Sequence, residues 1–331
     1  MRGGGWCIAD VGATLLRAMC DSLRWAMLNC SPLARADAAR IAAAAPFAHV
    51  AVETAGAPHV SPVLFASYAG RVWFLIARGT LKARTLAVRP RAGVLLRDGE
   101  RAVVLRGPVR LLDPARPDRW IRAPREASVA PLALQAFSLR NPRELAGFAL
   151  DALGGAGATG PGEVVLASLE PAWSVVAKVP AKGRSRSPDG PAPLDRVPHA
   201  VADLAERDGP AALGWMTAAG PVALPAHWRA ATGSAAVPTA LLEAAGARGV
   251  ARACVTLDAA DGRRPSAKRG VMLRGRGRAR RGSVVLDVER ATWWIGFETG
   301  TVPVSAPRGA AAPARRAAPR AGAAGAGRRA R

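Results

Sequence analysis

The sequence has few cysteine and histidine residues, and these shortages argue against whole classes of protein. It has 4 Cys and 4 His in 331 residues, with no C-x-x-C pair and no Cys/His cluster. A disulfide framework and a structural zinc site are therefore not expected, and no other metal site is predicted. No G-x-S-x-G motif of a serine hydrolase is present. The thiols indicate a reducing compartment, so we expect a cytoplasmic protein.

Long hydrophobic runs are also missing. No stretch of about 18 uncharged apolar residues occurs, which argues against a membrane-spanning helix. Residues 1–30 make a poor signal peptide, because Asp10 interrupts the apolar run. Apolar residues then recur every four positions from Val11 to Met27, as on one face of a helix. This segment is either a docking helix or an extension upstream of the native start.

The excess of basic residues is concentrated in two segments. The formal net charge is +23, but lysine occurs only at Lys82, Lys178, Lys182 and Lys268, and all other basic residues are arginine. Residues 263–281 and the tail 308–331 are rich in arginine and contain no acidic residue. The rest of the chain is only mildly basic, so nucleic-acid binding is not expected except through the basic tail. Residues 306–331 contain no large apolar side chain, and we expect them to be disordered.

Short strands and tight turns dominate the chain after a first helix, which begins at Ser31-Pro32 and ends near Ala45. Strand-like segments follow up to residue 112, with a short helix at 79–87 among them. Residues 114–160 are predicted to be helical, and one further strand covers 162–179. The pattern predicts a fold that is mainly β with helices, built on a small antiparallel barrel.

The second half of the chain repeats the first. Residues 181–198, rich in Pro, Ser and Arg, are the predicted linker between domains at 31–180 and 199–305. The alignment pairs Pro62 with Pro225, Arg101 with Arg269, and Arg106-Gly107 with Arg274-Gly275. A period of about 160–170 residues is too long for a solenoid, so we expect two split barrels in one chain. Such a chain is an intramolecular version of a two-fold dimer, and it could be a monomer.

The ordered motifs of the first half resemble the FMN-binding split barrel of the pyridoxamine 5'-phosphate oxidase superfamily. These motifs are P-H-V-S-P-V at 58–63, R-G-T-L-K at 78–82, and a strand pair ending in R-G at 106–107. The resemblance covers residues 35–112 well and 210–302 more faintly. It implies a flavin bound in a groove where the two barrels meet.

The resemblance also implies which residues hold the cofactor. The phosphate would lie at the start of a helix, whose free N–H groups and partial positive charge favour anions. The phosphate ligands implied are Arg78, Thr80, Lys82 and Arg84. The strand along the ring is implied to contain His59, Ser61, Pro62 and Val63, and Arg101 is implied to contact the ring or phosphate. The competing interpretation of the first set is a solvated basic helix face, and His59 is more often structural than catalytic in such a place.

The second copy departs from this pattern. Leu241 stands where the first copy has Lys82, and Glu243 where it has Arg84. An apolar residue and a carboxylate disfavour a phosphate, so we expect one flavin per chain. The second barrel could still wall that site with Trp293, Trp294 or the patch formed by Lys268, Arg269 and Arg274. The aromatic run at 291–297 is more simply part of the domain interface.

The sequence therefore predicts a flavin-dependent oxidoreductase that transfers a hydride to or from an unknown small-molecule substrate. FMN is the first choice of cofactor and the deazaflavin F-420 the second. No catalytic residue is identified, and the R-x-H signature of true pyridoxamine phosphate oxidases is absent. The alternative is a non-catalytic, degenerate split barrel that binds a polyanion through its basic tail and residues 263–281.

Overall fold

The computed structural model describes residues 33, 35–116, 120–121, 123–154, 163–180, 194–259 and 265–304. Four features predicted from sequence lie wholly or mostly outside these residues: the 1–30 segment, the helix start at Ser31-Pro32, most of the linker, and the basic tail. We refer to residues 33–180 as the first half and residues 194–304 as the second half.

The structure is mostly β, with helices around two antiparallel sheets, which confirms the predicted fold class. The strands of the first half are β1 (Ala48–Thr54), β2 (Ala57–Val63), β3 (Phe65–Tyr68), β4 (Arg71–Ala77), β5 (Arg91–Asp98), β6 (Arg101–Leu112), β7 (Val164–Leu169) and β8 (Trp173–Lys178). Those of the second half are β9 (Gly209–Thr217), β10 (Gly220–Arg229), β11 (Ser234–Ala236), β12 (Val250–Ala259), β13 (Arg269–Arg280), β14 (Ser283–Ile295) and β15 (Glu298–Pro303).

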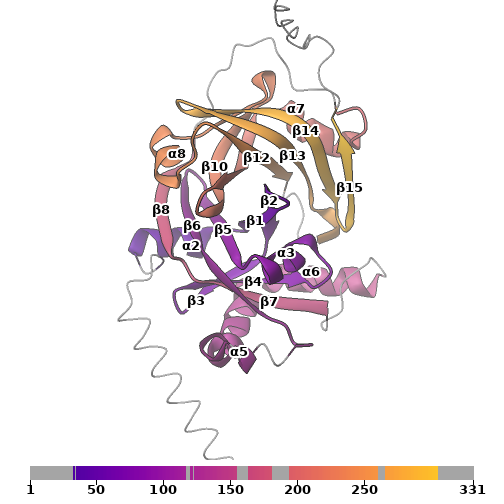
Figure 1. The fold of residues 1–331 in the computed structure, drawn as a ribbon. Coiled ribbons are helices and arrows are strands. Elements are labelled where there is room, and N and C mark those ends of the chain that lie inside the picture. Colours follow the sequence, from indigo (N-terminus) through magenta and orange to yellow (C-terminus); the bar gives the residue numbers. More distant parts are fainter. Residues whose placement is uncertain are drawn as a thin grey trace, which may run out of the picture.

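The helices are short and lie at the margins of the sheets. They are α2 (Ala36–Ala44), α3 (Leu81–Val88), α5 (Pro124–Arg140), α6 (Pro142–Leu153), α7 (His199–Glu206) and α8 (Thr239–Ala245), with single 3-10 turns η3 (Ala230–Thr232) and η4 (Pro265–Ala267). Figure 1 shows α5 at the far end of the first sheet, whereas α3 and α6 lie toward the second sheet, near β15. Within the described residues, no helix has the length and apolar character needed to cross a bilayer.

Local sequence signals account for several of these boundaries. Strands β1 and β2 form a hairpin around Ala55 and Gly56, which both adopt positive φ, as a tight two-residue turn requires. Helix α2 ends at Ala45, directly before Pro46, as predicted. Helix α3 begins after Thr80, whose hydroxyl accepts a hydrogen bond from the Ala83 N–H at 3.3 Å.

The single strand predicted over 162–179 is wrong, because the chain forms two strands there. β7 pairs with one end of β6 and β8 with the other, so β6 belongs to two branches of the sheet. The break falls at Glu170–Ala172, where Pro171 has no N–H to donate to a ladder. At the branch point a Cβ on Gly107 would lie 1.8 Å from the Glu170 carbonyl oxygen, so the chain passes too close for any other residue.

The two sheets share the order of their central strands. The first contains β2-β1-β5-β6 and the second β10-β9-β12-β13, all antiparallel. In the second sheet β14 runs unbroken along β13, and a further pairing of β11 with β14 closes the strands into a ring. Gly275 of β13 resembles Gly107, since its Cβ would lie 1.8 Å from the Asp287 carbonyl oxygen.

Residues paired by the sequence alignment occupy matching places in these sheets. Pro62 lies opposite His49 in the β1–β2 hairpin, and Pro225 lies opposite Ala212 in the β9–β10 hairpin. Arg101 lies opposite Asp98 at the tip of the β5–β6 hairpin, as Arg269 lies opposite Ala259 between β12 and β13. The register therefore agrees with the alignment at these positions.

The halves meet through reciprocal contacts. Arg106 of the first half donates to the Thr217 hydroxyl at 3.0 Å, and Arg274 of the second half donates to the Thr54 hydroxyl at 2.6 Å. The two threonines close equivalent hairpins, so each half presents the same pair of groups to the other. This is the pattern of an isologous, two-fold interface.

One apolar core crosses this interface. Val60 and Leu95 of the first half belong to the same buried cluster as Trp215 and Leu224 of the second. A Cβ on Gly93 would lie 2.7 Å from the Pro221 carbonyl oxygen, so the sheets touch backbone to backbone. Figure 1 shows the second sheet (orange to yellow) stacked on the first (indigo to magenta). The halves therefore pack as one body, which fixes the walls of any site between them.

Candidate functional site

A cavity of about 480 Å³ lies between the two halves. This volume is in the usual range for cofactor and small-molecule sites, roughly 300–1,000 Å³. Its lining is Phe47, Pro62, Val63, Leu64, Leu75, Ile76, Ala77, Thr80, Lys82, Phe137, Leu145, Phe148, Val164, Asp258, Ala259, Lys268, Arg269 and Trp294. The walls are largely apolar and aromatic, with a few charged groups from each half.

Lys82 is the charged group that the first half buries against this cavity. It lies in the first turn of α3, and its side chain is 8% exposed. No described residue forms a hydrogen bond or ion pair with its amino group. Burial lowers the pKa of Lys82 from 10.5 to about 7, because the charged form loses its hydration. A buried amine without a partner is costly, and an anion in the cavity would remove that cost.

Thr80 lines the cavity at the start of α3, but its hydroxyl is already used within the chain. The hydroxyl donates to the Ala77 carbonyl at 2.7 Å and accepts from the Ala83 N–H. Thr80 therefore shapes the helix start, and its hydroxyl hydrogen is not available to a ligand in this conformation. Of the first helical turn, the N–H groups of Leu81 and Lys82 remain as donors at this corner.

Strand β2 contributes the predicted residues Pro62 and Val63 to the lining. Ser61 and His59 are half-buried further along the strand, and the Ser61 hydroxyl lies 3.4 Å from His59 Nε2. Burial, followed by the charges of Lys82 and then Arg274, lowers the pKa of His59 to about 3. His59 is therefore neutral at physiological pH, and its buried Nδ1 has no hydrogen-bond partner among the described residues.

Three predicted arginines are not part of the cavity lining. Arg78 forms an ion pair with Asp113 at 2.7 Å, and Arg84 is exposed on α3. Arg101 lies 3.1 Å from Asp37, on α2 of its own half. The tip of the β5–β6 hairpin therefore does not contribute to this cavity. Arg269, the counterpart of Arg101, lines the cavity that contains Lys82.

The second half supplies the opposite wall, as the sequence suggested, through Lys268, Arg269 and Trp294. The Trp294 ring packs on Gly270, where a Cβ would approach it to 2.1 Å. The Lys268 amino group lies 4.5 Å from the centre of the Phe47 ring, a cation–π contact between the halves. Trp293 packs against Gly300 and is not part of the lining.

The sequence gave no sign of a histidine–carboxylate pair that joins the halves beside the cavity. His49 Nε2 on β1 lies 2.9 Å from Asp258 Oδ1 on β12, and both side chains are largely buried. Burial alone would raise the pKa of Asp258, but the charge and hydrogen bond of His49, with Arg97 and Lys268, hold it below its ordinary value. Each residue stands alone in an apolar strand, so no spacing links them.

Helices α5 and α6 close the cavity with Phe137, Leu145 and Phe148, which the sequence analysis also missed. The buried Asp151 of α6 accepts hydrogen bonds from the Ser266 N–H at 3.0 Å and the Ser266 hydroxyl at 2.9 Å. These bonds fasten α6 of the first half to η4 of the second.

The corresponding helix of the second half has a different composition. Helix α3 buries Lys82, Ala83 and Leu86, and α8 buries residues at the same spacing. Those residues of α8 are Leu241, Leu242 and Ala245. Leu241, which is 2% exposed, thus takes the place of Lys82.

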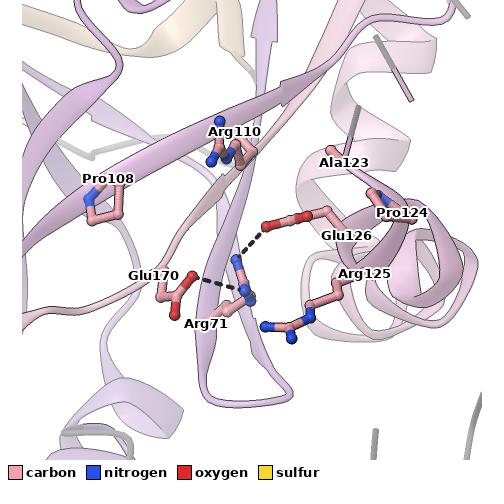
Figure 2. A pocket seen from close by; sticks show the side chains of 8 residues that line it. All are labelled: Arg71, Pro108, Arg110, Ala123, Pro124, Arg125, Glu126 and Glu170. Carbon is pink, nitrogen blue, oxygen red and sulfur yellow. Dashed lines mark hydrogen bonds and ion pairs between the residues drawn. The ribbon is translucent and has the colours of Figure 1, made fainter. Parts of the chain in front are cut away.

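Figure 2 shows a second cavity, of about 260 Å³, that belongs to the first half alone. Arg71 lies between two carboxylates there, 2.9 Å from Glu126 Oε1 on α5 and 2.9 Å from Glu170 Oε2 after β7. Arg110 and Arg125 also line it. The two carboxylates already neutralise the buried guanidinium of Arg71. The network therefore attaches α5 to the sheet, and we assign it no ligand.

The family model of pyridoxamine 5'-phosphate oxidase matches residues 34–151. The match includes Lys82 and all the elements from α2 to α6. The resemblance inferred from the motifs of the first half is therefore confirmed for that half. A comparison with curated proteins found no match.

Several solved structures are similar to part of the chain. A protein of unknown function from Agrobacterium tumefaciens strain C58 is 20% identical over 43% of this chain and 57% of that one, with a TM-score of 0.31. An FAD-binding protein from Mesorhizobium loti is 14% identical over 43% of this chain and 92% of that one, with a TM-score of 0.30. A NimC/NimA family protein from Clostridium acetobutylicum is 13% identical over 40% and 80%, with a TM-score of 0.27.

Proposed function

We propose that the cavity between the halves binds a phosphate-bearing flavin, and that the protein is a flavin-dependent oxidoreductase acting on a small molecule. FMN is the first choice of cofactor, and the deazaflavin F-420 is the alternative. The match of the first half to the pyridoxamine 5'-phosphate oxidase family supports this class. We expect the protein to work in the cytoplasm as a monomer whose two halves take the place of a dimer.

The observation that carries the proposal is the unpaired amine of Lys82 at an apolar cavity. A dianionic phosphate beside it would restore the charged amine and accept its hydrogen bonds. The free N–H groups of the first turn of α3 add donors at the same corner. Lys268 and Arg269 of the opposite wall add two basic groups to a lining whose single carboxylate is that of Asp258.

The other walls also fit a flat, apolar ring. Phe47, Phe148 and Trp294 come from different elements and line one cavity. His59 and Ser61 lie further along β2 and are not part of this lining. The neutral imidazole of His59 can donate one hydrogen bond and accept another, but it carries no positive charge at physiological pH.

A bound flavin would supply the hydride transfer, and the protein would supply binding, orientation and exclusion of water. Lys82 holds the phosphate in this proposal, and strand β2 with Trp294 orients the ring. His59 does not act as a proton donor at neutral pH, because its pKa is about 3. No protein nucleophile is required.

We further propose that the two halves are copies of one split barrel, and that only the first copy keeps the phosphate site. The matched strand orders and the reciprocal contacts of Arg106 and Arg274 support this origin. The replacement of the buried lysine by Leu241 supports a stoichiometry of one flavin per chain.

The test is flavin titration of Lys82→Met, followed by flavin fluorescence. Loss of charge-assisted hydrogen bonds worth about 1.5–3 kcal/mol should weaken FMN binding about 10- to 100-fold. Riboflavin, which has no phosphate, should bind the wild type and the variant equally. The control is Lys178→Met, which removes an exposed lysine on β8 and should leave FMN affinity unchanged.

Equal loss of FMN and riboflavin binding in Lys82→Met would reject the phosphate grip, because the substitution would then act on the cavity as a whole. Failure of the wild type to bind FMN, riboflavin or F-420 would reject the proposed function. Mass spectrometry of the cofactor extracted from purified protein decides between FMN and F-420.

A further inference from the structure

Strand β13 carries a row of exposed arginines away from the cavity. Arg276, Arg278 and Arg280 alternate with the buried residues Gly275 and Gly277, so the three side chains point to the same face of the sheet. Arg281 is exposed in the turn that follows. We call Arg276, Arg278, Arg280 and Arg281 the arginine ridge.

The ridge has few counter-charges. Arg276 lies opposite Arg252 on β12 and opposite Asp287 on β14, and Glu289 forms ion pairs with both Arg276 and Arg252. The carboxylates thus gather at the inner end of the ridge. No described residue forms an ion pair or hydrogen bond with the side chains of its outer three members.

The neighbours of those outer arginines are small and uncharged, or basic. Arg278 lies between Val250 and Val285, and Arg280 lies opposite Ser283. Arg248, just before β12, is exposed as well. The outer end of the sheet is therefore a positive surface on which Val250 is an exposed apolar side chain.

We propose that the arginine ridge binds the phosphate backbone of nucleic acid without sequence preference. Alternate residues of a strand lie about 6.6–6.8 Å apart, so the ridge offers evenly spaced guanidinium groups along a line. Each guanidinium presents a planar fork of donors that fits a phosphate. A membrane surface fits less well, because interfacial binding also needs large apolar residues to insert.

Two further observations agree with this partner. At the corresponding positions of β6, the first half has Pro108, Arg110 and Leu112, so the ridge is a property of the second half alone. The sequence that follows β15 adds seven arginines and no acidic residue between Arg308 and Arg331. The basic character of the chain is thus concentrated in residues 263–281 and in the tail 308–331.

The test compares two triple variants of the full chain that lose the same charge. The ridge variant is Arg278→Ala with Arg280→Ala and Arg281→Ala. The control variant is Arg35→Ala with Arg116→Ala and Arg143→Ala, three exposed arginines of the first half. Binding of a fluorescent short duplex, and of its single strand, is followed by anisotropy across a series of sodium chloride concentrations.

The ridge variant should lose about tenfold or more in affinity near 0.1 M salt. The number of ions released on binding, which the slope of log K against log salt concentration gives, should fall by about 2–3. The control variant should bind as the wild type does, and both should keep the wild-type melting temperature. Equal losses in the two variants would reject the ridge, because net charge or the tail would then explain binding. Absence of wild-type binding, or binding to phosphatidylserine vesicles but not to nucleic acid, would also reject it.

Discussion

The two halves of the chain share an architecture but treat one buried position in opposite ways. Both present an arginine to a threonine of the other half, and both press a glycine of the long central strand against a carbonyl oxygen. At the helix beside the interface, however, the first half buries Lys82 and the second buries Leu241. A leucine at this position favours folding, because its apolar side chain is stabilised by burial and has no charged group to lose its hydration. The lysine therefore indicates a site where an anion is expected.

This comparison separates residues that serve the shared architecture from residues that serve the cavity. Thr54, Thr217, Arg106 and Arg274 form matched contacts, so they belong to the interface of either half. Lys82 has no such match, and the family model covers it but not its counterpart. Burying the amine of Lys82 costs free energy of folding, and this cost arises in the first half, where Lys82 lines the cavity.

The largest effect is expected when the second half is made to imitate the first. Leu241→Lys would place an amine in the apolar contact that α8 makes through Leu241, Leu242 and Ala245. An unpaired buried charge costs about 3–5 kcal/mol, so the chain should lose that much in its free energy of unfolding. Urea denaturation at pH 7 measures it.

Leu241→Met is the matched control, because it keeps the volume without the charge and should cost less than about 1.5 kcal/mol. FMN should still bind Leu241→Lys with a stoichiometry of one, since the substitution creates no second site. Wild-type stability in Leu241→Lys would show that the position tolerates a charge and would remove the contrast between the halves.

A smaller effect is expected when the reciprocal arginine contacts are removed one at a time. Arg106→Ala and Arg274→Ala each delete a charged hydrogen bond across the interface, worth about 1.5–2 kcal/mol of stability. Only Arg274 acts on His59, whose pKa it helps to lower. Because burial is the largest cause of that low pKa, His59 should stay neutral in Arg274→Ala, and flavin affinity at pH 7 should be unchanged in both variants. A loss of flavin affinity in either variant would show that its contact also shapes the cavity.

Local signals in the sequence were enough for most elements of the first half. The Ala-Gly turn, the proline after α2 and the capping hydroxyl of Thr80 each act within a few residues of the boundary they set. The break between β7 and β8 was missed, because it depends on the close approach of Gly107 to Glu170 across the sheet. Such an approach leaves no periodic trace in the sequence.

The candidate site was predicted only in part, because some of its contacts also form between segments far apart in the chain. Pro62, Val63, Thr80 and Lys82 come from neighbouring elements and do line one cavity. The resemblance implied Arg101 at that cavity, but Arg101 pairs with Asp37 of its own half and Arg269 of the second half lines the cavity instead. The pair of His49 and Asp258 is likewise formed only when the halves dock. Tertiary contacts of this kind cannot be read from spacing along one chain.

The effect that is smallest per pH unit is the pH dependence of Lys82, which should act on stability and on flavin affinity in opposite directions. With a folded-state pKa of about 7 against 10.5, the unfolded chain binds more protons at this residue between those values. Stability without flavin should therefore rise with pH in this window, by at most about 1.4 kcal/mol per pH unit.

A phosphate needs the protonated amine, so FMN affinity should fall about tenfold between pH 7 and 8.5. The free energy of unfolding and the FMN affinity are each measured against pH for the wild type and for Lys82→Met, and the difference between the two proteins gives the contribution of Lys82. The same pH dependence in both proteins would contradict a titrating Lys82, because all other groups contribute equally to both.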